Sequence, residues 1–141
     1  MKAKVCIVDT NIVVAGLISA DPGSPPVQIL DAMFNGALMY LMSAELLDEY
    51  SAVLRRPRIS RHHGLTDDEI DKVLTELVAN AIWREPASAT GAPDPGDDHL
   101  WALLSSQAES VLVTGDKLLL DNSPPTSAVM SARHYVDLFF A

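Results

Sequence analysis

The chain has 141 residues and a formal net charge of −9, from 10 Lys and Arg against 19 Asp and Glu. Hydrophobic residues make up 48% of it, which supports a packed core and excludes disorder, and no apolar run approaches the roughly 20 residues of a membrane span. The acidic balance argues against a protein that binds nucleic acid through an overall basic surface. The length fits one domain covering residues 1–141, and the single cysteine and the lack of a signal-peptide pattern lead us to expect a cytoplasmic location.

The first predicted element is a short buried strand over residues 4–8, an apolar run that ends at an acid, Asp9. Asp9-Thr10-Asn11 then forms a turn or a helix start, and the apolar stretch 12–18 is predicted to be a short helix. Asp is a common helix N-cap, but three oxygen-bearing side chains in succession at a strand end also suit a metal ion and its waters. Asp9 is therefore the first candidate metal ligand.

A helix is predicted over residues 27–35, followed by a second buried strand over residues 38–42. Ser43 is then a suitable N-cap for a helix over about residues 44–56, and Pro57 is expected to stop this helix.

Glu49 lies on this helix and competes with Glu45 and Asp48 for a functional position. The apolar stripe centres near Tyr50, and at about 100° per residue Glu49 lies at the edge of the buried face. Glu45 and Asp48 fall farther round toward solvent. Glu49 can thus reach into a cleft, whereas the alternative is an ordinary surface charge.

The second half of the chain continues the alternation of helical and extended segments. Helices are predicted over residues 66–80, 98–108 and 132–139, and short strands over residues 82–84, 111–114 and 128–130. Strands that alternate with helices indicate an α/β protein, a three-layer α/β/α sandwich with a mostly parallel central sheet.

Adjacent acids precede the helix at residues 98–108, in the segment Asp94-Pro95-Gly96-Asp97-Asp98-His99. One acid must cap the helix and one or more can bind metal. Ideal helical periodicity points Asp97 more toward the apolar face than Asp98, but a cap residue lies outside the helix, so the periodicity does not decide between them. His99 is expected to be a surface or helix-end histidine rather than a ligand.

Asp116 ends the strand at residues 111–114, after Thr114 and Gly115. The ends of parallel strands meet at one edge of a sheet, where α/β proteins bind ligands. Carboxylates gathered there repel one another unless a cation lies between them, and oxygen-rich clusters suit Mg²⁺ or Mn²⁺. The sequence therefore predicts a divalent-metal site that acts on a phosphate-bearing substrate. The four acids predicted to form it are Asp9, Glu49, Asp98 and Asp116.

Basic residues are concentrated in one stretch, although the molecule is acidic overall. The cluster consists of Arg55, Arg56, Arg58 and Arg61. These arginines are candidates for contacts to RNA phosphates, and the alternative is a solvated helix end, where cations are also favoured.

Taken together, these segments resemble the PIN-domain family, in particular the toxin ribonucleases of prokaryotic toxin–antitoxin operons. The resemblance covers nearly the whole chain and rests on residues 8–11, 43–50, 53–57, 94–100, 112–116 and 129–135. No single segment is specific, but their order and spacing together form a strong signal.

The resemblance assigns the four acids of the family to positions in this chain. The first matches Asp9, the second Glu49 and the fourth Asp116. The third matches Asp98, judged by its distance from Asp116, although the neighbouring Asp97 could share or replace its role.

Further properties follow from the same resemblance. Thr10, Asn11 and Thr114 match polar supports that the family places around the acids. The resemblance implies an endoribonuclease that depends on Mg²⁺ or Mn²⁺ and forms a homodimer or higher oligomer. It also implies a partner antitoxin that silences the enzyme.

Three other classes of protein share part of this pattern. Phosphatases that form an aspartyl-phosphate need a second Asp two residues after the first, where this chain has Asn11. A phospho-receiver domain needs an acceptor Asp after a middle strand, and none follows residues 38–42. The alternatives to an active ribonuclease are a non-catalytic acidic interaction module, a weakly active PIN protein, and an unrelated metal-dependent phosphohydrolase.

Overall fold

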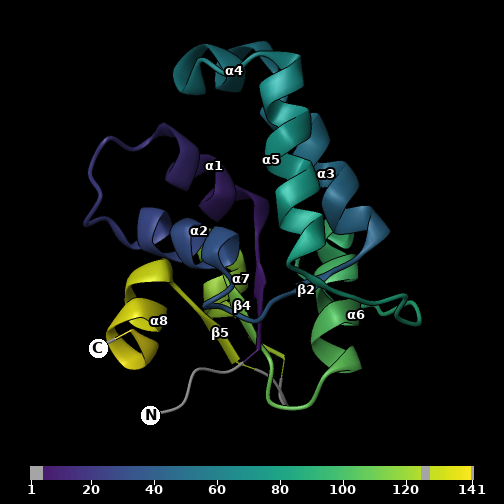
Figure 1. The fold of residues 1–141 in the computed structure, drawn as a ribbon. Helices are drawn as coiled ribbons and strands as arrows, with labels where there is room; N and C mark the ends of the chain where they lie inside the picture. Colours follow the sequence, from purple (N-terminus) through teal and green to yellow (C-terminus); the bar gives the residue numbers. More distant parts are fainter. Residues whose placement is uncertain (1–4, 125–127, 141) are drawn as a thin grey trace.

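The computed structural model describes residues 5–124 and 128–140, and they form a parallel sheet covered by helices (Figure 1). The strands are β1 (Cys6–Val8), β2 (Leu41–Met42), β3 (Ile82–Trp83), β4 (Val111–Val113) and β5 (Ala128–Met130). Pairing is parallel throughout, with the orders β1-β4-β5 and β2-β3. A parallel bridge between Cys6 and Tyr40 joins the two sets side by side.

Helices connect the strands in the order expected for an α/β protein. They are α1 (Thr10–Ile18), α2 (Pro25–Asn35), α3 (Ala44–Leu54), α4 (Pro57–His63), α5 (Asp67–Ala79), α6 (Asp98–Ser106), α7 (Lys117–Asp121) and α8 (Ala132–Phe139), with a 3₁₀ turn η1 (Pro95–Asp97) before α6. In Figure 1, α1, α2 and α8 lie on one side of the sheet, and α3, α5 and α6 lie on the other. The predicted fold class is therefore confirmed, with a mostly parallel central sheet between helices.

Local sequence explains where several helices begin and end. Ser43 caps α3 by accepting a hydrogen bond from the main-chain nitrogen of Leu46 at 3.2 Å. Thr66 and Glu69 form a full capping box at the start of α5. Gly36 ends α2 at a φ of 80°, a left-handed conformation that glycine adopts without steric cost.

The structure contains two helices that the sequence did not predict, α4 and α7, and one strand is shorter than predicted. Pro57 was expected to stop a helix, but it also begins α4, because proline suits the first position of a helix. Between the predicted strands at residues 111–114 and 128–130, where no helix was predicted, lies α7, which Asp116 caps. The strand predicted over residues 38–42 is regular only at Leu41–Met42. Of the strand predicted over residues 4–8, residue 4 lies outside the described residues.

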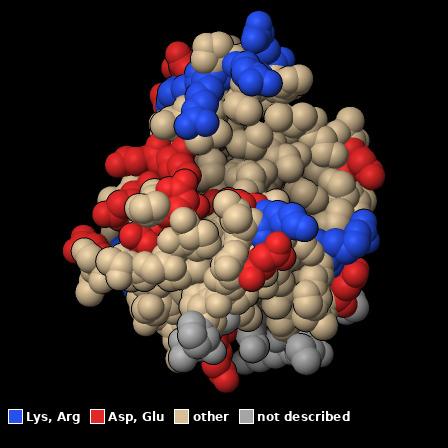
Figure 2. Space-filling view, turned by 180° about the vertical axis from the view of Figure 1, so that it is seen from behind, with Lys and Arg blue, Asp and Glu red and all other residues tan. Residues whose placement is uncertain are grey.

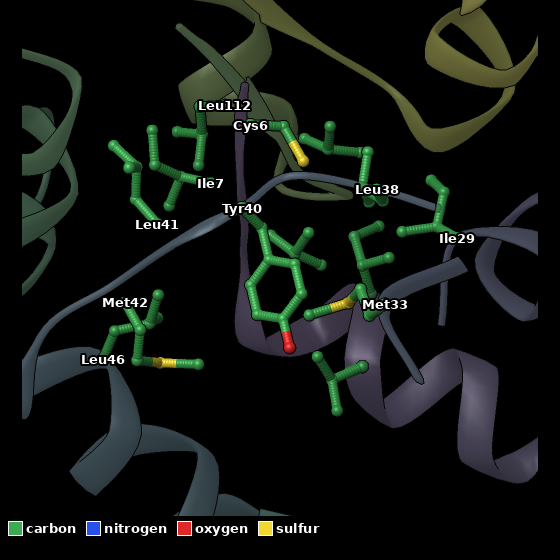
Figure 3. Packing of buried hydrophobic residues seen from close by; sticks show 14 of the residues in the cluster. Cys6, Ile7, Ile29, Met33, Leu38, Tyr40, Leu41, Met42, Leu46 and Leu112 are labelled. Atoms are coloured by element: carbon green, nitrogen blue, oxygen red, sulfur yellow. The ribbon is translucent and has the colours of Figure 1, made fainter. Parts of the chain in front are cut away.

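The hydrophobic core lies on both faces of β1 and β2 (Figure 3). Tyr40 is fully buried there among side chains of the strands and of α2. Its hydroxyl donates a hydrogen bond to the main-chain oxygen of Leu77 on α5, which satisfies the buried polar atom. Within the described residues, no helix is both long and apolar enough to span a bilayer.

Candidate metal centre

Asp9 stands at the carboxyl end of β1 and is the N-cap of α1. Only 5% of the residue is exposed, and its main-chain nitrogen continues the β1–β4 ladder by donating to Val113 at 2.9 Å. Oδ1 accepts a hydrogen bond from the main-chain nitrogen of Thr10 at 2.8 Å, and Oδ2 accepts from the hydroxyl of Thr114 at 2.7 Å. Oδ1 keeps another lone pair, so this carboxylate is oriented and can still bind a cation.

A hydrogen-bonded network ties the ends of β1 and β4 together around Asp9. Asn11 donates to Oδ2 of Asp9 at 3.3 Å and accepts at Oδ1 from the main-chain nitrogen of Gly115 at 2.9 Å. The Thr114 hydroxyl also accepts from the main-chain nitrogen of Asp116 at 3.0 Å. The polar residues expected beside the first acid therefore fix the relative position of two acids from distant parts of the chain.

Glu49 reaches the same place from α3. The next residue, Tyr50, is fully buried and donates a hydrogen bond from its hydroxyl to the main-chain oxygen of Val8, at the end of β1. This contact sets the rotation of α3 about its axis, so that Glu49 lies at the margin of the buried face. Glu45 and Asp48 are exposed, as the periodicity predicts.

The structure brings Asp97, rather than Asp98, to the other three acids. Asp94 accepts from the main-chain nitrogen of Gly96 at 2.9 Å and so shapes η1. Asp98 accepts from the main-chain nitrogen of Ala92 at 3.1 Å and holds the preceding loop. Asp97 is the N-cap position of α6 but makes no capping hydrogen bond with its side chain, and it faces the other acids. Of the two alternatives that the sequence leaves open for the third acid, the structure favours Asp97 over Asp98, because Asp97 lines the same space as the other acids and the carboxylate of Asp98 holds the loop.

His99 lies next to the acids, although it was expected to be a surface or helix-end histidine. Its Nε2 lies 3.3 Å from Oε2 of Glu49. One ligand atom each from Glu49, Asp97 and His99 lies within 4.8 Å of the others, a spacing that suits ligands of one ion. The only signal in the sequence is the position of His99 two residues after Asp97, which places both at the start of the same helix.

Unpaired polar atoms also gather here. Among the described residues, the buried side-chain atoms without a well-formed hydrogen bond are Thr10 Oγ1, His99 Nδ1 and Glu49 Oε2, the last of which meets Nε2 of His99 only as the 3.3 Å ion pair. Buried polar atoms are normally hydrogen-bonded, so a group of exceptions at one place indicates a missing water or ion. The residues present therefore fit a bound divalent cation.

The pKa values of the acids reflect their crowding. Burial raises the pKa of Asp9, and the charges of Glu49 and Asp116 raise it further. Burial together with the neighbouring acids raises the pKa of Asp97 to about 6. His99 instead lowers the pKa of Glu49, and Glu49 raises that of His99. Bringing these charges together without a cation is thus unfavourable for two of the acids.

The acids line one end of an open cleft of about 610 Å³ between α1, α3 and α4, which we call the acidic cleft. Its polar lining consists of Asp9, Thr10, Asn11, Ser19, Glu49, Asp97 and Asp116. Val14, Ala15, Ile18, Val53 and Ile59 complete the lining. Asp98 does not belong to this lining and faces a smaller pocket with Glu45 and His99.

The predicted arginine cluster divides into two parts. Arg55 forms ion pairs with Asp67, at 3.1 Å, and with Asp71, so that it joins α3 to α5. Arg56, Arg58 and Arg61 are exposed on and next to α4. Figure 2 shows a group of Lys and Arg atoms at the end of the molecule where α4 lies, next to a group of Asp and Glu atoms. Arg55 is therefore removed from the predicted RNA contacts, because its guanidinium already binds two carboxylates.

Comparisons with known proteins agree with this architecture. A family profile described as "PIN domain" matches residues 5–118. The solved PIN domain of T. brucei RRP44 superposes with a TM-score of 0.55, at 14% identity, over 96% of this chain and 80% of that chain. At this identity the similarity shows a shared fold. No curated protein matches the chain significantly.

Proposed function

This chain belongs to the PIN domain family, a fold generally found in metal-dependent nucleases, and on that premise we propose that it is an endoribonuclease. The reaction is hydrolysis of an RNA phosphodiester bond, in which the oxygen of a water bonds to phosphorus and the bond to the leaving ribose oxygen breaks. The cofactor is Mn²⁺ or Mg²⁺.

The observation that carries this proposal is the convergence of acids from four distant parts of the chain. Asp9, Glu49, Asp97 and Asp116 line one end of a single cleft. An acidic interaction module requires no such convergence, and the unpaired polar atoms of Thr10, Glu49 and His99 have no role in one. A cation bound between the acids would give Glu49 a partner and offset the repulsion that raises two of the pKa values.

Glu49, Asp97 and His99 would hold the ion, with Asp9 and Asp116 beside them. A bound divalent ion supplies a water of lowered pKa and stabilises negative charge on the phosphate. The carboxylate oxygens suit Mg²⁺ or Mn²⁺, and the imidazole of His99 favours Mn²⁺ of the two.

The residues of the chain itself act by orienting the acids and by attracting the substrate. Thr114 and Asn11 keep the carboxylate of Asp9 fixed through their hydrogen bonds. Asp116 lines the cleft while one of its oxygens caps α7 at 2.9 Å from Leu118, which leaves this carboxylate oriented to position the attacking water. Arg56, Arg58 and Arg61 offer the positive charge that attracts RNA phosphates to this end of an acidic molecule.

The direct experiment is cleavage of a panel of single-stranded and structured RNAs by the purified protein, with Mn²⁺, with Mg²⁺ and with EDTA. We expect internal cuts with either ion and none with EDTA. Cleavage that persists in EDTA, or that Asp9→Asn leaves unchanged, would contradict a mechanism based on this cluster. If no RNA is cut under any condition, the acidic interaction module gains support.

We further propose, from the resemblance described above, that the protein is the toxin of a toxin–antitoxin pair in the cytoplasm and that it self-associates. Expression should then arrest growth, and Asp9→Asn or coexpression of the product of the neighbouring gene should relieve the arrest. Light scattering should give a mass of at least a dimer. Growth that is unaffected by the active protein would contradict the toxin role while leaving the nuclease activity untouched.

A further inference from the structure

The helix α4 has little packing to hold it in place. It is 7 residues long, and none of its residues is buried. A helix this short is not stable on its own in water. It lies at the end of the molecule beyond α3 and α5, where it packs against α1 and α3 (Figure 1). Specific side-chain contacts must therefore fix its orientation.

The two faces of α4 carry different side chains. Ile59 and His63 are one helical turn apart on the inward face, and both are partly buried. Ile59 lines the acidic cleft. Arg58 and Arg61 are three residues apart on the other face, and both are exposed. The rotation of α4 about its own axis therefore decides whether Ile59 faces the cleft and the two arginines face solvent together.

The imidazole of His63 connects α4 to the helices on either side of it. Its Nε2 lies 2.8 Å from the main-chain oxygen of Leu54, a carbonyl at the end of α3 that has no partner within that helix. Its Nδ1 accepts a hydrogen bond from the main-chain nitrogen of Leu65, just before α5, at 2.9 Å. Since a carbonyl only accepts and an N–H only donates, the ring is neutral with its proton on Nε2. Among the described residues, the other side-chain hydrogen bonds of α4 stay within the helix.

Resting on the proposed nuclease function, we propose that His63 is a positioning residue, which orients α4 so that Arg58 and Arg61 form one basic surface for RNA phosphates next to the acidic cleft. His63 is not part of the cleft lining, so it acts through the two arginines. Without its ring, α4 keeps its covalent connections but loses the hydrogen bonds that set its rotation. The arginines then no longer meet the phosphates of a strand that is bound at the acids.

Measurements on the protein without RNA test the positioning itself. At a pH where the rings are neutral, nitrogen NMR should show the proton of His63 fixed on Nε2, whereas the exposed ring of His62 should exchange between its tautomers. His63→Phe should speed amide hydrogen exchange across residues 57–65 by at least about tenfold and leave exchange in α1, α3 and α5 unchanged. His62→Phe is the matched control and should change nothing. Mixed tautomers at His63, unchanged exchange in His63→Phe, or faster exchange throughout the protein would overturn the proposal.

A cycle of substitutions tests the link to the arginines. The probe is a fluorescent oligouridylate of about ten nucleotides, whose anisotropy is followed with Mn²⁺ in protein that carries Asp116→Asn to suppress cleavage. His63→Phe should weaken binding about fivefold when Arg58 and Arg61 are present and less than about twofold when both are replaced by Gln. His63→Gln, which can still donate to Leu54, should recover part of the loss.

The two kinds of measurement separate the positioning of α4 from the nuclease function. An equal loss of RNA binding in both arginine backgrounds, or no loss in either, would overturn the proposal, and binding of Mn²⁺ by His63→Phe should equal that of the wild type. Faster exchange confined to residues 57–65 of His63→Phe, in a protein that neither binds nor cuts RNA, would support the role of His63 in orienting α4 and reject the proposed nuclease function.

Discussion

Several hydrogen bonds fix the carboxylates on the sheet side of the acidic cleft, whereas the carboxylates on the side facing them are held less firmly. The sheet side consists of Asp9, Asn11, Thr114 and Asp116, and every one of these side chains takes part in a hydrogen bond. The helix side consists of Glu49 and Asp97, with His99 next to Glu49. Oε2 of Glu49 lies 3.3 Å from Nε2 of His99, and the side chain of Asp97 makes no capping hydrogen bond. Folding therefore sets the positions of the acids on the sheet side, and we propose that a bound cation completes the helix side.

Asp9→Asn tests the sheet side with the largest expected effect. Asparagine caps helices as well as aspartate does, so the fold should persist, while the charge next to the ion is lost. We expect metal-dependent cleavage to fall by at least about 100-fold. This is more than the fall of about 10- to 100-fold that follows when a residue that only orients a ligand is replaced. Circular dichroism and thermal melting provide the control for folding. Retention of wild-type cleavage by the folded variant would show that Asp9 is not part of the machinery.

Thr114→Val tests whether the hydrogen bonds on the sheet side matter for function. The substitution keeps the shape of the residue but removes the donor to Asp9 and the acceptor for the main chain at Asp116. Residues that are hydrogen-bonded to a metal ligand hold that ligand in the correct orientation. We therefore expect a loss of about 10- to 100-fold in metal affinity or activity. The readout is the Mn²⁺ concentration for half-maximal cleavage, which should rise. A fall in stability with unchanged Mn²⁺ dependence would assign Thr114 a structural role alone.

The arginines test whether the substrate approaches the acidic cleft from α4. Replacing Arg56, Arg58 and Arg61 by glutamine should weaken RNA binding and reduce the slope of log affinity against log salt by about 2, at roughly 0.7 per phosphate contact. Arg55→Gln is the internal control, because this side chain pairs with Asp67 and Asp71. That variant should cost about 1 kcal/mol or less of stability and keep the wild-type salt slope. Equal slopes for the triple variant and the wild type would rule out phosphate contacts at α4.

Asp97→Asn tests how unfavourable the crowded negative charge on the helix side is, through the free energy of unfolding. The pKa of Asp97 in the folded protein is about 6, above its ordinary value of 3.8, so between these values the folded state binds more protons than the unfolded state. The free energy of unfolding in EDTA should therefore fall as pH rises from about 4 to about 6. Asp97→Asn removes this contribution and should be more stable than the wild type at pH 7, by about 1 kcal/mol after allowance for solvent screening.

Urea unfolding at a series of pH values between 4 and 7, with EDTA, measures this difference. Asp9 is present in both proteins, so its own contribution largely cancels. Saturating Mn²⁺ should reverse the order, because the ion stabilises the protein that binds it more tightly. Parallel pH curves for the two proteins would contradict the crowding of charge at Asp97.

Periodicity and strand ends were sufficient to place most of the cleft. Asp9 and Asp116 follow apolar runs that could only be buried strands, and parallel strands bring their ends to one edge. The stripe centred on Tyr50 located Glu49 on the correct face of α3. The α/β fold followed from the same alternation of segments and is confirmed by the structure.

Hydrogen bonds within a short turn explain why the sequence did not identify Asp97 as the third acid. Asp94 and Asp98 bind main-chain nitrogens of Gly96 and Ala92, which leaves Asp97 to face the cleft. Such bonds depend on the 3₁₀ turn η1, which helical periodicity does not describe. The role of Arg55 was missed because its partners, Asp67 and Asp71, lie on a helix whose packing against α3 is a tertiary feature.

The central claim is that the acidic cleft binds a divalent cation through both of its sides. Titration of the metal-free protein with Mn²⁺, followed by calorimetry at neutral pH, tests it most directly, with Asp97→Asn and Asp98→Asn as a matched pair of neighbouring substitutions. We predict saturable binding by the wild type, at least about tenfold weaker binding by Asp97→Asn, and binding within about twofold of wild type by Asp98→Asn. Wild-type affinity in Asp97→Asn, or no binding by the wild type at all, would contradict the account.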